Sequence, residues 1–210
     1  MAAVAWGDAA SPPIDPQGYY HVGSRGSYGQ LLFRTPDQYE LFLRLYARSA
    51  QKYGWETLTW VLMPNHHHFV IKLTEGGLSE GLRELHGSFS RRIHAMYGMT
   101  GQGHLVRHAF FGRELRSDAE ILVAGRYVDL NESTATKRRP EATHWGGYRA
   151  TVGLERPRPF HNPHELLGLI SPTPNSARTA YRQFVLEGLA SQGPDPSPND
   201  GVGSAPRVHG

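Results

Sequence analysis

The sequence predicts an α+β fold in which helices pack on an antiparallel sheet. Short stretches rich in Val, Thr and aromatic residues are typical of strands, and longer stretches with apolar residues every three to four positions are typical of amphipathic helices. A third observation is their order along the chain, which is strand-helix-strand and then again strand-helix-strand. This order, β-α-β-β-α-β, is the ferredoxin-like split arrangement.

The first half of the chain supplies one strand, one helix and a hairpin. Residues 19–24 are expected to form the first strand. A helix is expected to begin after Thr35, where Thr-Pro-x-Gln is a capping-box start signal, and to end at Gly54. Residues 55–63 and 66–73 are rich in strand-forming residues and are separated only by a Pro-Asn turn. We therefore expect these two strands to form a hairpin.

The second half supplies the remaining helices and one strand. Apolar spacing predicts a helix over 78–97, and a fourth strand is expected around 110–111. A second capping box opens an added helix over 118–131. Two small helices are expected over 163–169 and 176–189, as a C-terminal helical extension. The helices would cover one face of the sheet, and the other face would stay open or be capped by the added helix.

Composition limits the domain organisation and the class of protein. The chain is rich in Gly and Pro toward both ends, so we expect a disordered segment over 1–17, a main domain over 18–153, the helical extension over 154–190 and a disordered tail over 191–210. No apolar run is long enough to cross a bilayer, and the start lacks the basic segment of a signal peptide. A cytoplasmic protein without a membrane partner is expected.

Charge and cysteine content restrict the possible chemistry. Lys plus Arg exceed Asp plus Glu by 22 − 19 = 3, a mild excess that does not by itself imply nucleic acid. The chain has no cysteine, which excludes disulfides and thiolate metal sites. Any bound metal must therefore take nitrogen or oxygen ligands.

Two histidines on the predicted strand 66–73 form the first half of a possible metal site. Side chains alternate along a strand, so His66 and His68 point the same way, with Cα atoms about 6–7 Å apart, while Phe69 and Ile71 point the other way. Because the chain holds 12 histidines, roughly 0.7 such His-x-His pairs are expected by chance. The pair needs a partner elsewhere in the chain before it indicates a metal site.

The added helix offers such partners. Tyr127 and Asn131 are four residues apart and share one helix face. A tyrosine hydroxyl can act as a covalent nucleophile, and an asparagine carbonyl oxygen can bind a hard divalent ion. The alternative is a core aromatic with a satisfied hydroxyl and a residue at the helix C-terminus.

Five motifs follow one another along the chain: Tyr20-His21-Val22 with Ser24-Arg25-Gly26, Met63-Pro64-Asn65-His66-x-His68, Gly103-His104-Leu105, Arg126-Tyr127-Val128-x-Leu130-Asn131, and Trp145 with Tyr148-Arg149. In this order they resemble the REP-associated tyrosine transposases, which are relatives of the single-strand insertion-sequence transposases in the HUH (His-hydrophobic-His) nuclease group. The resemblance covers about residues 19–153, and 162–190 is similar to a helical extension that many members carry.

The resemblance implies a reaction and a cofactor. It implies that His66 and His68 bind Mg²⁺ or Mn²⁺, with Asn131 as the third ligand. It also implies that Tyr127 attacks a DNA phosphodiester and becomes linked to the 5′ phosphate, leaving a free 3′ hydroxyl. The physical chemistry agrees, since a bound cation polarises the phosphate and offsets the charge of the transition state. The protein would be a DNA endonuclease and strand transferase.

Basic residues are candidates for contacts with single-stranded or hairpin DNA. They would contact phosphates and make binding fall with salt, whereas the alternative is a solvated helix face. Phe110 and Phe111 are candidates for stacking on unpaired bases, against an ordinary role in the core. The oligomeric state stays open between monomer and homodimer, and in a dimer the tyrosine could serve the partner chain. The candidate DNA-binding arginines are Arg25, Arg83, Arg91, Arg92, Arg107, Arg113 and Arg116, with a second cluster at Lys137-Arg138-Arg139.

Departures from the family pattern leave two other hypotheses. His67 stands where an apolar or aromatic residue is usual, Asp129 replaces a usual His, and the residues after Leu105 and after Asn131 differ. These changes are compatible with a hairpin DNA-binding protein of the same fold that has lost catalysis. A histidine-rich metal-binding protein unrelated to DNA is the third hypothesis.

Overall fold

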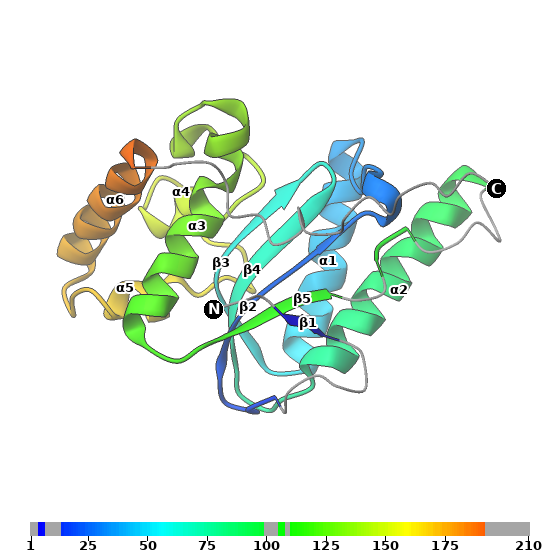
Figure 1. The fold of residues 1–210 in the computed structure, drawn as a ribbon, viewed down its shortest axis with the longest axis horizontal. Helices are drawn as coiled ribbons and strands as arrows, with labels where there is room; N and C mark the ends of the chain where they lie inside the picture. Colours follow the sequence, from blue (N-terminus) through cyan, green and yellow to red (C-terminus); the bar gives the residue numbers. More distant parts are fainter. Residues whose placement is uncertain (1–3, 7–13, 99–104, 108–109, 192–210) are drawn as a thin grey trace, which may run out of the picture.

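A computed structural model describes residues 4–6, 14–98, 105–107 and 110–191 (Figure 1). It contains one antiparallel sheet of five strands, in the spatial order β1-β5-β2-β4-β3. The strands are β1 (Val4–Trp6), β2 (Tyr19–Arg25), β3 (Trp55–Met63), β4 (His66–Leu73) and β5 (Phe110–Leu115). The α-helices are α1 (Pro36–Lys52), α2 (Leu78–Tyr97), α3 (Asp118–Thr136), α4 (Tyr148–Thr151), α5 (Pro163–Gly168) and α6 (Pro174–Ala190).

The expected element order is confirmed, with one addition. The elements β2-α1-β3-β4-α2-β5 follow one another as the sequence predicts, and β3 and β4 form the expected hairpin. The segment 1–17 was expected to lack structure, but β1 pairs antiparallel with β5. The added strand covers backbone groups of β5 that would otherwise form an unpaired sheet edge. The tail was expected over 191–210, and all of it except Ser191 lies outside the described residues.

One face of the sheet is covered by α1 and α2 (Figure 1). Both helices carry apolar residues at helical spacing, and these residues are buried against the sheet. Tyr46 of α1 stacks on Phe69 of β4 with ring centroids 4.0 Å apart, and Phe42 contacts Phe89 of α2 edge to face. This layer is the larger of two apolar cores.

The opposite face is covered by α3, α5 and α6 (Figure 1), so the added helix does cap it. Val128 of α3 is fully buried in this second core, together with Val70 of β4 and Leu166 of α5. The helix begins as predicted, because Ser117 accepts a hydrogen bond from the backbone N–H of Glu120. It runs past the expected end at residue 131 to Thr136, so Asn131 lies inside the helix.

Polar contacts join the extension to the rest of the fold. Tyr181 of α6 donates a hydrogen bond to Asp129 of α3 over 2.7 Å. Glu165 of α5 accepts hydrogen bonds from Lys72 of β4 and from Tyr19 of β2. The extension therefore holds α3 against the sheet. None of the helices in the described ranges combines the length and apolar character needed to span a bilayer.

Candidate active site

The two predicted ligand histidines lie on the sheet face that α3 covers. β4 lies between β2 and β3, so its backbone is held on both sides. His66 and His68 point toward α3, with ring centroids 5.3 Å apart, and His67 points into the core under α1 and α2. The alternation predicted from the sequence is confirmed.

α3 brings the other two predicted residues to the same place. Asn131 Oδ1 lies 2.9 Å from His66 Nε2. The ring of Tyr127 meets the ring of His68 edge to face, with centroids 5.6 Å apart. The structure thus brings together all four residues predicted to carry the chemistry, from one strand and one helix.

A fifth residue, His21 of β2, belongs to the first motif of the family resemblance but was not predicted to be a site residue. Its Nε2 lies 3.0 Å from Nδ1 of His68, and its ring lies 5.5 Å from the ring of Tyr127. The sequence places His21 on a strand but gives no register between β2 and β4. The register sets Gly23 opposite His68 and Val70 opposite His21, which puts His21 on the face of the site. The pairing of β2 with β4, which no local motif encodes, is what identifies His21 as a residue of the site.

Burial keeps the imidazoles of His21 and His68 neutral. Removal from water lowers the pKa of His68 well below its ordinary value, and it lowers the pKa of His21 to about 3, with a further contribution from the charge of Arg113. A neutral imidazole has one nitrogen with a free lone pair, which is the form that binds metal ions.

The donor set fits a hard or borderline divalent cation. His66 Nδ1 lies 2.7 Å from Asn65 Oδ1, and Nε2 lies 2.9 Å from Asn131 Oδ1. Both amide oxygens are acceptors, so a neutral ring, which carries one proton, can donate to only one of them. In the tautomer protonated on Nδ1, the lone pair of Nε2 faces Asn131 Oδ1. Adjacent ligands of an octahedral ion with bonds of about 2.1 Å are about 3 Å apart. A cation would satisfy both atoms.

No cluster of three His, Cys, Asp or Glu side chains with metal-binding geometry occurs among the residues that the structure describes. The predicted ligand set is smaller, with two imidazoles and the amide oxygen of Asn131. An amide oxygen is a ligand that Mg²⁺ and Mn²⁺ accept, and both ions can keep several waters.

Three of the predicted DNA-binding arginines lie near this face. Arg25 is paired with His66 in the sheet register and Arg113 with His21, so both belong to the face of the site. The backbone N–H of Arg107 donates to the carbonyl oxygen of Arg25 over 2.9 Å. Arg113 and Arg116 form ion pairs with Glu120 and Glu114, at 3.1 Å and 2.7 Å.

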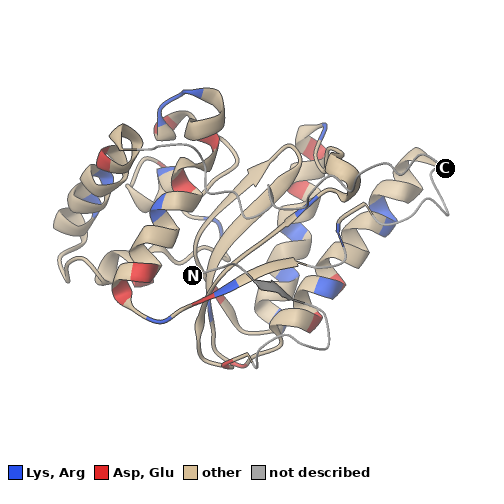
Figure 2. Cartoon of the chain, viewed as in Figure 1, with Lys and Arg blue, Asp and Glu red and all other residues tan. Residues whose placement is uncertain are grey.

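Three more of the seven predicted arginines lie on the opposite side of the sheet. Arg83, Arg91 and Arg92 are exposed on α2. Figure 2 shows basic residues along both helices of this layer. Arg91 and Arg92 line a groove of about 400 Å³ between α1 and α2, together with Arg48. The structure does not bring these side chains to Tyr127.

The two aromatic residues predicted to stack on DNA bases lie on opposite faces of the sheet. Phe110 is buried in the core under α1 and α2, so the core interpretation holds for it. Phe111 is half-buried on the opposite face, and its ring meets His21 edge to face at 5.0 Å. Only Phe111 borders the site.

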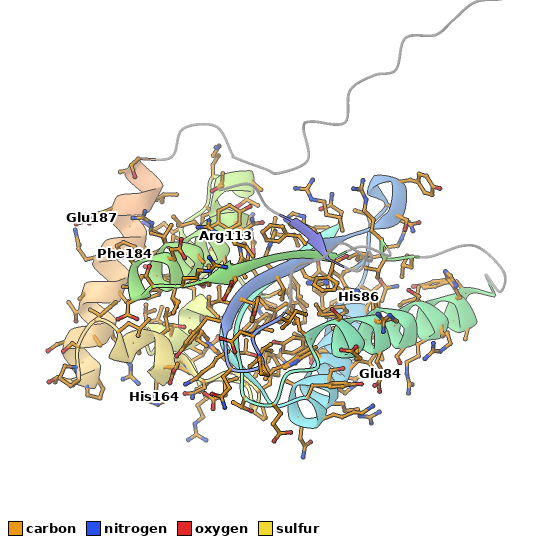
Figure 3. All side chains as sticks on the ribbon, turned by 60° about the horizontal axis from the view of Figure 1, so that its bottom comes forward. Glu84, His86, Arg113, His164, Phe184 and Glu187 are labelled. Atoms are coloured by element: carbon orange, nitrogen blue, oxygen red, sulfur yellow. The ribbon has the colours of Figure 1, made fainter. Side chains whose placement is uncertain are left out.

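The departures at 67 and 129 lie around the site and not in it. His67 Nε2 lies 3.0 Å from Nε2 of His86 of α2, and burial lowers the pKa of both rings. Figure 3 shows His86 beside the sheet and Arg113 beside α3. Asp129 accepts hydrogen bonds from Thr59 and Tyr181, and its burial raises the pKa of the carboxyl to about 7.

Comparison with known proteins assigns the chain to a family. A family model described as "Transposase IS200 like" matches residues 16–131, which is more than half of the 210 residues. The chain belongs to the IS200-like transposase family. The match includes both histidines predicted to be ligands and the predicted nucleophile Tyr127, and it ends at Asn131. No curated protein matches the chain.

Solved structures support the fold of this transposase family member. A REP-associated tyrosine transposase bound to a REP hairpin is 15% identical, with a TM-score of 0.58, over 70% of this chain and 85% of that one. A candidate transposase from Deinococcus radiodurans R1 is 14% identical, with a TM-score of 0.41, over 55% of this chain and 92% of that one. The first confirms an α+β fold with an antiparallel sheet, and the resemblance to the REP-associated transposases holds at this level.

Proposed function

We propose that this transposase family member is a metal-dependent single-stranded DNA endonuclease and strand transferase that acts on hairpin-containing repeats through a 5′-phosphotyrosine intermediate. We assign its core, 18–153, to the ferredoxin-like HUH class, with 154–190 as the helical extension. One observation carries the proposal: the ring of Tyr127 lies 5.6 Å from the ring of His68, while Asn131 lies 2.9 Å from His66. A nucleophile and a ligand set thus face one another.

The chemistry assigned to Tyr127 is a transesterification. Its hydroxyl oxygen forms a bond to the scissile phosphorus as the bond from phosphorus to the 3′ oxygen breaks. The proton lost by the phenol is balanced by protonation of the 3′ oxygen, so a free 3′ hydroxyl is left. Attack of a 3′ hydroxyl on the phosphotyrosine reverses the step and joins strands. No water is consumed.

The ligand set positions the phosphate. His66, His68 and Asn131 would hold Mg²⁺ or Mn²⁺, and such an ion polarises the phosphate and offsets developing negative charge. The three side chains come from one strand and one buried helix, which fixes their separation. Because a phenol is mostly protonated at neutral pH, its attack needs this cationic environment or a base.

The DNA is proposed to lie along the face of the site. Arg25, Arg107 and Arg113 would contact phosphates there, and Phe111 would stack on an unpaired base. The related solved transposase is bound to a REP hairpin, and we propose a hairpin as the ligand of this chain too. Arg83, Arg91 and Arg92, on the outer side of α2, would give a second set of phosphate contacts away from the reacting bond.

The tyrosine is proposed to act on the metal site of its own chain. A single chain supplies Tyr127, His66 and His68, the ring of Tyr127 contacts that of His68, and α6 holds α3 in place. A mixture of Tyr127→Phe and His66→Ala chains should therefore stay inactive. Recovery of activity in the mixture would indicate that the tyrosine serves a partner chain.

The test is formation of a covalent protein–DNA adduct. A labelled oligonucleotide carrying a hairpin and a single-stranded flank is incubated with Mn²⁺, and denaturing electrophoresis detects protein-linked label. The wild type should form the adduct, and Tyr127→Phe should not. Tyr97→Phe is the matched control, because its phenol lies at the end of α2 and bonds to Gln38. Equal adduct from wild type and Tyr127→Phe rejects the proposed nucleophile.

A catalytically lapsed DNA-binding protein is the second candidate. The departures at His67 and Asp129 favour it, as does the engagement of both His66 nitrogens with asparagine side chains. It predicts salt-sensitive binding of hairpin DNA by the wild type with no adduct in either Mg²⁺ or Mn²⁺. Membership of a transposase family argues against the third hypothesis, a metal-binding protein unrelated to DNA.

A further inference from the structure

We propose that His21 is a positioning residue that orients His68 as a metal ligand. His21 accepts a hydrogen bond from Nδ1–H of His68, and this leaves the Nε2 lone pair of His68 for the cation. The inference rests on the proposed metal-binding role of His68. It adds a residue of β2 to a ligand set otherwise drawn from β4 and α3.

The contact between the two rings allows only one productive arrangement of protons. His21 Nε2 and His68 Nδ1 are 3.0 Å apart, which is hydrogen-bonding distance. One of these nitrogens must carry the proton and the other must accept it. If His21 donated, a neutral His68 would carry its proton on Nε2 and could not bind a cation there. Metal binding through Nε2 therefore requires His68 to donate and His21 to accept.

The backbone of β2 is shaped to permit this contact. Gly23 lies directly opposite His68, and His21 lies two residues further along the strand. A Cβ atom at position 23 would come within 2.6 Å of the carbonyl oxygen of His67 and within 2.7 Å of Nδ1 of His68. A side chain at this position would thus push the imidazole of His68 away from His21. Because Gly23 has no side chain, the rings of His21 on β2 and His68 on β4 have room to contact each other.

His21 is fixed on its other sides as well. Its ring meets Phe111 and Tyr127 edge to face, with centroids 5.0 Å and 5.5 Å away, and only 7% of the residue is exposed. A ring packed in this way has little freedom to rotate away from His68. His21 therefore touches both a proposed metal ligand and the proposed nucleophile.

His66, the other histidine proposed as a ligand, also has an acceptor beside its second ring nitrogen. Asn65 Oδ1 lies 2.7 Å from Nδ1 of His66, and in the tautomer protonated on Nδ1 it accepts that proton while the lone pair of Nε2 is directed toward Asn131. Histidine ligands commonly donate their second N–H to a neighbouring acceptor, which sets the tautomer and the ring orientation. In this chain Asn65 would serve His66, and His21 would serve His68.

The first test measures the affinity for Mn²⁺ alone in the full-length protein, by titration calorimetry without DNA. His21→Phe keeps a ring but removes the acceptor, so the dissociation constant should rise by roughly 10- to 100-fold. His21→Gln restores an acceptor and should recover part of the loss. His86→Phe is the matched control, because His86 contacts His67 at 3.0 Å on the other side of the same strand. The control should leave Mn²⁺ affinity unchanged.

The second measurement needs no substitution. Long-range ¹H–¹⁵N spectra of the histidines in the Mg²⁺-loaded wild type should show His68 protonated on Nδ1. Protonation on Nε2, or a folded His21→Phe protein that binds Mn²⁺ like the wild type, overturns the proposal for His21. A wild type that binds no Mn²⁺ overturns the proposed metal site itself, so the two failures can be told apart.

Discussion

At the scale of single residues, the pair formed by His66 and Asn131 determines what the site can bind. When His66 is protonated on Nδ1, its Nε2 and Asn131 Oδ1 are two acceptor atoms 2.9 Å apart, and they repel each other unless a cation lies between them. The pair is also only partly buried, so a hydrated ion can reach it. Substitution of Asn131 is therefore a direct test of the proposed metal site.

The effect of an Asn131 substitution on metal affinity should depend on whether the new side chain keeps an oxygen at this position. Asn131→Ala removes the third ligand, and we expect the dissociation constant for Mn²⁺ to rise roughly tenfold or more. Asn131→Asp keeps an oxygen at the same place and adds charge, so it should bind at least as tightly as the wild type. Calorimetric titration measures both. Wild-type affinity in Asn131→Ala would exclude this residue as a ligand.

At the scale of elements, α3 is held between the sheet and the C-terminal extension. The buried carboxyl of Asp129 is the centre of this contact, with donors from Thr59 of β3 and Tyr181 of α6. The proposed nucleophile and the proposed third ligand, Tyr127 and Asn131, lie two residues to either side of Asp129. A polar network at this point therefore sets the position of the helix that carries the chemistry.

Loss of the Tyr181 hydroxyl should destabilise the protein. Tyr181→Phe leaves a buried carboxyl with one donor fewer, which costs about 1–3 kcal/mol of the free energy of unfolding. Tyr46→Phe is the matched control, because it removes an equally buried hydroxyl whose partner is the neutral hydroxyl of Thr57. Urea unfolding should show the larger loss for Tyr181→Phe. A loss no larger than that of the control would mean that Asp129 does not depend on α6.

The arginines of α2 should affect binding and leave the chemical step unchanged. The sheet separates Arg91 and Arg92 from Tyr127, so their joint replacement by Ala should weaken hairpin binding and reduce the slope of log K against log salt by about 2. At saturating DNA, the rate of adduct formation should match the wild type. Arg156→Ala, an exposed arginine after α4, is the control. An unchanged salt slope would show that α2 does not contact DNA.

At the scale of the whole molecule, the sequence predicts the order of the elements better than their pairing. Alternation along 66–73 and the four-residue spacing of Tyr127 and Asn131 each depend on local periodicity, and both are confirmed. Three other features depend on contacts between residues that are distant in the sequence. They are the packing of the α3 face against the β4 face, the register that brings His21 to His68, and the pairing of β1 with β5. Single-sequence patterns do not encode such contacts, although the family resemblance anticipated the first of them.

The folded chain should lose stability in mild acid because it buries neutral histidines. Burial lowers the pKa of His161 from 6.5 to about 4. Below pH 6.5 the unfolded chain gains a proton on this ring that the folded chain does not take up until about pH 4. The free energy of unfolding therefore falls across this interval, by about 1 kcal/mol for this residue between pH 7.5 and 5.5.

His161→Gln isolates that contribution. Glutamine does not titrate and can still donate to the carbonyl oxygen of Leu58, which His161 contacts at 3.0 Å. Urea unfolding of both proteins at pH 7.5 and 5.5 should show a smaller loss of stability for the variant. Equal losses would mean that His161 is not held neutral by the fold.

The central claim is that the phenol of Tyr127 attacks a DNA phosphate beside a cation held by His66 and His68. The most direct test is mass spectrometry of the protein after reaction with a hairpin oligonucleotide and Mn²⁺, followed by nuclease and protease digestion. We predict a peptide that carries a 5′-linked nucleotide phosphate on Tyr127, absent from His66→Ala. A nucleotide on any other residue, or an unmodified Tyr127 after the DNA has been cleaved, would contradict the account.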